Sequence, residues 1–259
     1  MGKIIPFSEV ESYLESIEKK DFHKGTILDT NILISASYDI RDSHSEVLDV
    51  WDLLLKNGYR LFATVNTRSE YLEFQRRLIL TERLFDMVDE FSKYRVPQRA
   101  RARIQVLKGS LKTSKITDPD KDEVFNESQL KKIKKEFSAG PHSGQESWLK
   151  ICDACLKGKI RQEDVALIDH GIEYISPHEV SQKDLFNYSL GWPGAIDICE
   201  KAGTAFSDSM ILNALKSSNL LLIVTLDFDI GYAALSDPDM KDVVVPDRLF
   251  KEYRHYHFP

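Results

Sequence analysis

The stretch Gly25-Thr26-Ile27-Leu28-Asp29-Thr30-Asn31-Ile32-Leu33-Ile34 decides the fold class of this chain. It begins as a short apolar, β-branched run, meets a carboxylate at Asp29 and then becomes apolar again. This pattern predicts a buried strand that passes directly into a helix. A side chain at the carboxyl end of a strand in a parallel sheet points toward the crevice where ligands bind. Asp29 is therefore expected at that edge, and its role depends on which other acids reach it.

The regions on either side of this stretch repeat the alternation of strand and helix. Strands are predicted at 26–29, 60–65, 220–225 and 242–246. Helices are predicted to begin near Ser8, Ser43, Asn66 and Phe206. Strands joined by helices in this order favour right-handed crossovers onto a central, mostly parallel sheet. The sequence therefore predicts an α/β domain formed by residues 1–94 and 191–259.

The alternation stops between residues 95 and 190. The segment 95–136 contains 12 Lys or Arg against six Asp or Glu, a local net charge of +6 in a chain of −6. We predict that 95–190 is a largely helical, partly basic insertion. Such charges usually form a solvated helix face, but inside a protein that acts on nucleic acid they are candidates for phosphate contact. The candidates are Arg99, Arg101, Arg103, Lys131, Lys132, Lys134 and Lys135.

Composition excludes several classes of protein. A hydrophobic content of 42% over 259 residues supports a sizeable core, and a net charge of −6 excludes a uniformly basic nucleic-acid coat. The N-terminus lacks the apolar core of a signal peptide, and the apolar run 220–226 is too short to span a bilayer. Three cysteines are too few for a disulfide scaffold, and Cys152-Asp153-Ala154-Cys155 favours two core-facing thiols over a zinc site. We expect a cytoplasmic protein with no membrane partner.

Acids are predicted to converge at the carboxyl edge of the sheet. Asp29 and Asp227 each follow a strand, and Asp229 comes two residues later. Glu70 lies in the first turn of the helix after a strand. Asp208 begins a helix that must run back toward the amino edge to feed the next strand, so its own N-terminus belongs at the carboxyl edge. Alone, Asp208 would be interpreted as a helix cap, whereas the ordered set favours a site.

Crowded carboxylates repel one another and take up protons unless a cation intervenes. A cluster whose ligands are all oxygen atoms suits Mg²⁺ or Mn²⁺, which bind a few carboxylates and keep several waters. Such ions activate water and neutralise a phosphodiester during in-line attack. The pattern therefore predicts metal-assisted cleavage of a nucleic-acid backbone.

The same motifs resemble those of the PIN-domain nucleases. The resemblance covers 25–92 and 200–246, and its motifs are Leu28-Asp29-Thr30-Asn31-Ile32-Leu33, Glu70, Asp208-Ser209-Met210-Ile211-Leu212-Asn213-Ala214 and Val224-Thr225-Leu226-Asp227-Phe228-Asp229. It implies an α/β/α sandwich with a central, mostly parallel sheet. It also implies Mg²⁺- or Mn²⁺-dependent endonuclease activity, usually on RNA, that leaves 5′-phosphate and 3′-hydroxyl ends.

By position, the resemblance implies roles for seven residues. Catalytic and metal-binding roles fall to Asp29, Glu70, Asp208 and Asp227; Asp229 is similar to an accessory metal ligand; Asn31 and Thr225 are similar to residues that orient the acids. The chain departs from the family in two respects. Ile230 stands where an aromatic residue often follows the last acid, and the long insertion is unlike the compact PIN proteins of toxin–antitoxin pairs.

Two other functions fit parts of the pattern. One is a catalytically inactive PIN-like module that binds RNA or a protein, against which the complete set of four acids argues. The other is a phosphatase of the haloacid dehalogenase type, which needs a second Asp two residues after the first, where this chain has Asn31. The sequence leaves open whether DNA is also cut. It also leaves open a homodimer and an inhibitory protein partner, both compatible with the resemblance.

Overall fold

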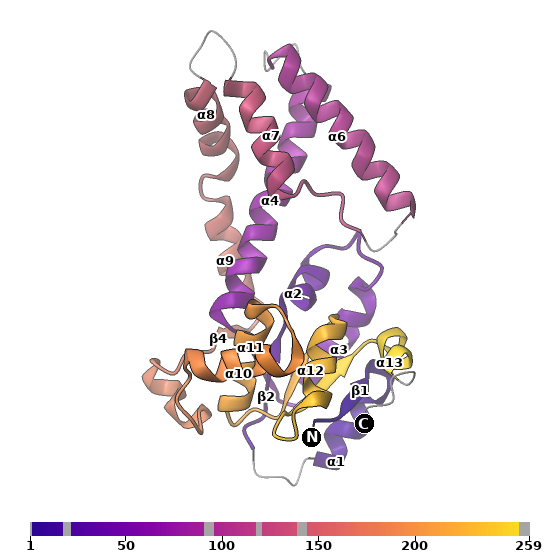
Figure 1. Cartoon of the computed structure of the whole chain (residues 1–259), viewed down its shortest axis with the longest axis vertical. Coiled ribbons are helices and arrows are strands. Elements are labelled where there is room, and N and C mark those ends of the chain that lie inside the picture. Colours follow the sequence, from indigo (N-terminus) through magenta and orange to yellow (C-terminus); the bar gives the residue numbers. More distant parts are fainter. Residues whose placement is uncertain (1, 18–21, 91–95, 118–120, 139–143, 254–259) are drawn as a thin grey trace. The chain divides into compact units, whose positions relative to one another are not determined.

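The computed structural model describes residues 2–17, 22–90, 96–117, 121–138 and 144–253 (Figure 1). The strands are β1 (Ile4–Pro6), β2 (Gly25–Leu28), β3 (Arg60–Ala63), β4 (Ile172–Tyr174), β5 (Leu222–Val224) and β6 (Asp242–Val245). The α-helices are α1 (Val10–Ile17), α2 (Thr30–Ser37), α3 (His44–Lys56), α4 (Val65–Asp89), α6 (Gln98–Thr117), α7 (Glu127–Ser138), α8 (Gly144–Leu156), α9 (Lys159–Asp169), α10 (Trp192–Ala202), α11 (Phe206–Ser217), α12 (Phe228–Ser236) and α13 (Asp247–Tyr253). Two short 3₁₀ helices are η1 (Phe7–Glu9) and η2 (Val180–Leu185).

The described strands form one six-stranded sheet in the order β1-β6-β5-β2-β3-β4, and every pairing is parallel. The predicted α/β class with a mostly parallel sheet is therefore confirmed. Strand β2 lies inside the sheet, where Ile27 pairs with Ile223 of β5 on one side and with Phe62 of β3 on the other. The chain leaves β2 toward β3 and leaves β5 toward β6, in opposite directions. Such a switch point opens a crevice at the carboxyl ends of the two strands.

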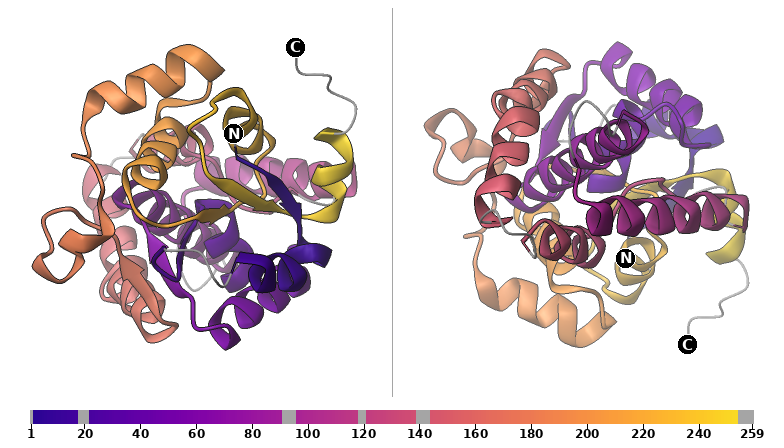
Figure 2. Two further views of the ribbon diagram at one scale, coloured as in Figure 1. Left: turned by 90° about the horizontal axis from the view of Figure 1, so that it is seen from below. Right: turned by 90° about the horizontal axis from the view of Figure 1, so that it is seen from above.

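Alternate side chains of the strands face opposite sides of the sheet. Ile27, Phe62 and Ile223 share a buried apolar cluster with side chains from α10, α11 and α12. Their neighbours in sequence, such as Leu28 and Val224, are also buried and belong to the opposite face. In the left view of Figure 2, α10 to α12 lie on one side of the sheet and the indigo α1 and purple α3 on the other. Burial on both faces explains why the strands are continuously apolar.

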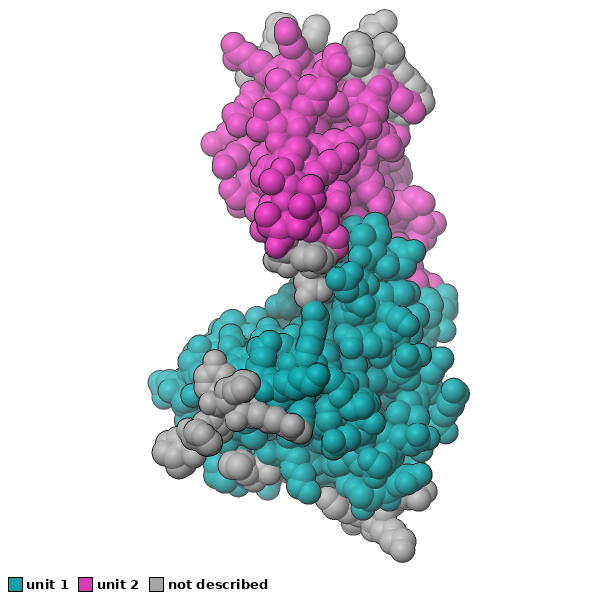
Figure 3. All heavy atoms as spheres, turned by 90° about the vertical axis from the view of Figure 1, so that its right-hand side faces the viewer, with its two compact units in different colours: residues 1–71, 167–259 teal, residues 72–166 magenta. Residues whose placement is uncertain are grey.

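The chain divides into two compact units, coloured in Figure 3. The first unit comprises residues 1–71 and 167–259 and contains the sheet, and the second comprises 72–166. These boundaries differ from the predicted insertion at 95–190. The division falls within α4, because this single helix of 25 residues continues past 71. The second boundary falls at residue 167 and not at 190, because β4 pairs with β3 and returns the chain to the sheet.

The second unit is helical and has its own core. Buried side chains from α4, α6, α7 and α8 form one apolar cluster, which includes Leu80, Ile104 and Ile133, together with Phe125 just before α7. Its other buried members are Leu84, Met87, Val88, Ala100, Leu111, Leu130, Phe137, Trp148 and Cys155. Cys152 packs against the same cluster, as the prediction of two core-facing thiols required. Among the described helices, none combines the length and the apolar composition that a bilayer span requires.

Candidate active site

Two of the predicted acids follow neighbouring strands. Asp29 follows β2 and caps α2, where its side chain accepts a hydrogen bond from the Thr30 backbone N–H at 2.6 Å. Asp227 lies just past β5 and caps α12, where it accepts a hydrogen bond from the Asp229 backbone N–H at 2.8 Å. Because β2 and β5 are paired in parallel, both acids reach the same edge of the sheet.

Two polar side chains join the loops that carry these acids. Thr225 is fully buried, and its hydroxyl donates a hydrogen bond to Asp29 Oδ2 at 2.7 Å. The same hydroxyl oxygen accepts a hydrogen bond from the Asp227 backbone N–H at 2.9 Å. Asn31 Oδ1 accepts a hydrogen bond from the Leu226 backbone N–H at 2.9 Å. The ends of β2 and β5 are thereby held in one arrangement, and their acids with them.

Glu70 reaches the same place from another helix. It lies in the second turn of α4, and Glu70 Oε2 accepts a hydrogen bond from the Thr30 hydroxyl at 2.7 Å. Thr30 directly follows Asp29, so the first turn of α2 contacts both carboxylates. Sequence reasoning did not single out Thr30 as part of the site. What could have identified Thr30 is its position: it carries a hydroxyl group and directly follows an acid at the end of a strand.

Asp208 completes the group from the first turn of α11, where it is half-buried. Burial raises the pKa of Asp208 to about 6, the charges of Asp227, Glu70 and Asp229 add to the rise, and a hydrogen bond from Ser207 opposes it. The interaction between two charges falls with their separation, so the charges that act on Asp208 are nearby ones. Asp208 therefore lies near acids from two other segments, Glu70 of α4 and the pair Asp227 and Asp229 at the start of α12.

The most strongly perturbed acid is Asp29. Burial raises the pKa of Asp29 to about 7, and the charges of Asp227 and Asp208 raise it further. Hydrogen bonds from Thr225 and Thr30 act in the opposite direction, because they favour the ionised carboxylate. A buried carboxyl group that stays half-protonated near neutrality, among other acids, is in an environment suited to a cation.

The acids are neighbours but do not form a finished cation cage. Among the described residues, no group of three or more Asp, Glu, His or Cys side chains is arranged to hold a metal ion. The acids can still raise one another's pKa values, because repulsion between charges acts over longer distances than the bonds of a metal ion to its ligands. The carboxylates instead accept protein hydrogen bonds, from Thr30 and Thr225 at Asp29 and from Asp229 at Asp227. Each carboxylate oxygen has a second lone pair, so these bonds do not exhaust it.

The predicted basic side chains lie on α6 and α7 of the second unit. Arg99, Arg103 and the four lysines of α7 are exposed, whereas Arg101 is half-buried. Arg103 forms an ion pair with Glu136 at 3.5 Å. Ile133 and Phe137 of α7 point into the core, so the lysines line the rest of this helix. The second unit has 20 Lys or Arg against 15 Asp or Glu, a net charge of +5, and the rest of the chain carries −11.

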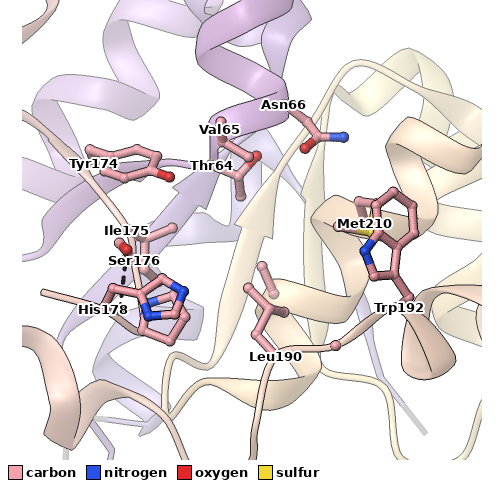
Figure 4. Close-up of a pocket in the computed structure, with 13 residues that line it drawn as sticks. Thr64, Val65, Asn66, Tyr174, Ile175, Ser176, His178, Leu190, Trp192 and Met210 are labelled. Carbon is pink, nitrogen blue, oxygen red and sulfur yellow. Dashed lines mark hydrogen bonds between the residues drawn. The ribbon is translucent and has the colours of Figure 1, made fainter.

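A pocket that sequence reasoning missed lies in the first unit (Figure 4). It has a volume of about 200 Å³, and its lining includes Thr64, Asn66, Tyr174, Trp192 and Met210. Tyr174 and Trp192 stand on opposite sides in the close-up. The lining shares helices with the acids, because Asn66 belongs to α4, as does Glu70, and Met210 belongs to α11, as does Asp208. The signal in the sequence was Gly191-Trp192-Pro193, a tryptophan between two turn-forming residues.

The fold and the acids at the carboxyl edge define an α/β protein with an acidic candidate site between β2 and β5. Comparisons of the chain with protein-family models, with curated proteins and with solved structures found no match. What the site does is therefore inferred from its own residues.

Proposed function

We propose that this chain is a PIN-like endoribonuclease that hydrolyses RNA phosphodiester bonds with the help of Mg²⁺ or Mn²⁺. The observation that carries the proposal is the set of acids Asp29, Glu70, Asp208 and Asp227 from four segments, where burial first, and neighbouring acid charges second, raise the pKa of Asp29 and of Asp208 above ordinary values. Folding rarely gathers acids without a partner, because each added charge opposes the native state. A divalent cation is the partner that such a set fits.

The donors fit a hard cation. They are carboxylate oxygens, with no sulfur or imidazole ligand in the group, which suits Mg²⁺ or Mn²⁺ better than zinc. Asp29, Glu70, Asp208 and Asp227 would hold the ion, and Asp229 lies near enough to contribute charge to Asp208. When bound, such an ion activates water and stabilises a leaving oxygen.

The protein residues supply orientation and charge. The hydroxyl of Thr225 fixes one oxygen of Asp29, and the hydroxyl of Thr30 fixes one oxygen of Glu70, so both carboxylates keep defined directions. Burial of Asp29 excludes water and strengthens every electrostatic contact at the site. The exposed basic residues of α6 and α7 offer sites for phosphates elsewhere on a long RNA.

Cleavage assays test the proposal directly. Structured RNA, single-stranded RNA and single-stranded DNA are incubated with Mg²⁺, with Mn²⁺ or with a chelator. We expect cation-dependent cleavage of RNA that falls at least about a hundredfold in Asp29→Asn and in Asp208→Asn, because electrostatic groups at a reaction centre usually contribute this much. Asp197→Asn is the matched control, since Asp197 is an exposed acid of α10. Equal cleavage by the native protein and Asp29→Asn would contradict the proposal.

A second candidate is a PIN-like module that binds RNA or a protein and does not cut. One observation favours it: the described acids, as they lie, are not arranged to hold a metal ion. Mn²⁺ titration by calorimetry separates the two functions. A nuclease site loses affinity for Mn²⁺ in Asp208→Asn and keeps it in Asp197→Asn, whereas a binding module gives the same weak titration for all three proteins.

A further inference from the structure

The pocket beside the acids carries an exposed aromatic surface. Trp192 and Phe206 stack face to face, with ring centroids 5.3 Å apart and an angle of 14° between the ring planes. Trp192 is 64% exposed and Phe206 38%, and Tyr174 across the pocket is 40% exposed. Large aromatic side chains are usually buried, because hydration of their faces is unfavourable. Tyr174 and Trp192 line one small pocket, and Phe206 packs against Trp192 from outside the lining. Two exposed aromatic side chains on opposite sides of this pocket indicate a flat, apolar ligand.

A polar group stands at the same pocket. The side-chain amide of Asn66 lines it, and this amide makes no hydrogen bond to any other described residue. In Figure 4 Asn66 lies between the side of the pocket with Tyr174 and the side with Trp192. An amide offers a donor and an acceptor side by side, the combination that pairs with the edge of a nucleobase.

The wall around Trp192 is held in place by the protein. Asn213 Nδ2 donates a hydrogen bond to the Gly191 carbonyl at 2.9 Å, so the residue before Trp192 is tied to α11. A methyl group on Gly194 would lie 2.3 Å from Asn213 Oδ1, which shows how closely α10 and α11 approach here. The aromatic face is therefore a built surface of the first unit.

The pocket is placed next to the acids by helix geometry. Asn66 and Glu70 are four residues apart on α4, on the same face and about 6 Å apart along the axis. Met210 of the pocket lining and Asp208 belong to the same helix, α11, but two residues apart they lie on different faces of it, so the link between the pocket and the acids is the Asn66–Glu70 face of α4. A base in the pocket would therefore have its own backbone phosphate within reach of the acidic site.

We propose that the pocket between Tyr174, Asn66 and the Trp192–Phe206 stack binds one unpaired nucleobase of a single-stranded nucleic acid, next to the phosphate at the acidic site. This proposal rests on the proposed function, which places an RNA phosphate at the acidic site. It adds to that function a subsite for a base and a preference for unpaired strands. The stacking face holds the base, and the Asn66 amide contacts its edge. A base inside a duplex could not enter, because both its faces are covered.

Binding of short oligonucleotides in chelator tests the subsite without any cleavage. The probes are a fluorescein-labelled single-stranded RNA pentamer, the same pentamer with an abasic central residue, and the DNA form of each. Fluorescence anisotropy gives the affinities. We expect Trp192→Ala to weaken binding of the intact pentamers by roughly ten- to hundredfold, since stacking contributes that much per base, and to leave the abasic ones within about twofold. Trp192→Phe should restore most of the loss.

Tyr188→Ala is the matched control, because Tyr188 is a 71% exposed aromatic residue outside the pocket lining. Asn66→Ala should reduce the differences in affinity among A, C, G and U at the central position. Fluorescence of Trp51 and buried Trp148 reports that the variants fold. Equal binding of intact and abasic pentamers by the native protein would overturn the base subsite, even if RNA cleavage is observed. Base-dependent binding without cleavage in Mn²⁺ would overturn the nuclease and leave the subsite standing.

Discussion

Asp29 is a carboxyl group that the fold buries at a cost. It is 4% exposed, and burial together with the charges of Asp227 and Asp208 raises its pKa from 3.8 to about 7. The unfolded chain therefore loses this proton near pH 4, whereas the native protein keeps it until about pH 7. Between these values the native state binds the extra proton, so stability falls as the pH rises and levels off above pH 7.

Replacement of Asp29 by Asn should remove this fall in stability. In chelator at pH 8 we expect Asp29→Asn to be more stable than the native protein by on the order of 3 kcal/mol, and the difference should shrink toward pH 4. Urea unfolding at pH 4, 6 and 8 measures it. Asp197→Asn, on an exposed acid, should follow the native curve throughout. Parallel pH profiles for Asp29→Asn and the native protein would contradict the assigned pKa.

At this scale the sequence predicts the acids better than it predicts their surroundings. Asp29 and Asp227 were placed correctly at one sheet edge because strand ends leave a local signal that topology then brings together. Trp192 and Asn66 were not identified, because nothing local to either relates α10 to the start of α4. Metal binding by these acids stays a prediction, because shifts of only a few ångströms in their side chains separate a set that holds a metal ion from one that does not.

At the scale of elements, strands inside continuous apolar runs were predicted and the two outside such runs were missed. β3, β5 and β6 fall within the predicted ranges, and β2 begins one residue before its predicted range, at Gly25. β5 also has three residues, but it lies in the apolar run 220–226, whereas β1 and β4 lie in no such run and were missed. Neither Ser8 nor Ser43, near which helices were predicted to begin, caps a helix with its side chain. Ser8 donates its hydroxyl to Asp247 instead, and Ser43 exchanges a hydrogen bond with Ser35 at 2.9 Å. In both cases a tertiary partner displaced the local one.

A pair of glycines tests how tightly β2 is enclosed. A methyl group on Gly25 would lie 2.7 Å from Phe62 Cε2 and 2.8 Å from Leu220 Cδ2, and both side chains are buried. Gly25→Ala should therefore destabilise the protein by about 1–3 kcal/mol. On the exposed face of α6, Gly109 has nothing within 4 Å of such a methyl group. Gly109→Ala should stabilise its helix by about 0.5–1 kcal/mol.

Hydrogen exchange followed by mass spectrometry checks this pair segment by segment. Gly25→Ala should speed exchange in β2 and in the strands beside it, and Gly109→Ala should slow exchange in α6. The same sign for both variants would contradict the packing around β2, because only the space available to the new methyl group distinguishes the two sites.

At the scale of the whole molecule, charge is divided between the two units. The unit with the acids carries −11 and the helical unit +5. A net negative charge repels nucleic acid at long range, so the proposed binding of RNA requires a local basic surface. The exposed lysines of α7 are the candidates for it.

Salt dependence measures that contribution. Combined replacement of Lys131, Lys132 and Lys135 by Gln should reduce the slope of log affinity for single-stranded RNA against log salt concentration by up to about 2, since each lost phosphate contact removes about 0.7. The matched control replaces Lys56, Lys183 and Lys251, three exposed lysines of the other unit, with the same change in net charge. Equal slope changes in both variants would show that only net charge matters.

The pairing of β2 with β5 also governs how the protein can be made. Thr225 and Asp29 are 196 positions apart, whereas the buried cluster of the helical unit lies wholly between Leu80 and Cys155. Contacts close in sequence form first, and a ribosome releases the chain from its N-terminus. The helical unit can therefore complete its core while the sheet still lacks β5 and β6. During synthesis the chain carries Asp29 and Glu70 without Asp208 and Asp227, so its acidic site comes into existence only when the last strands emerge.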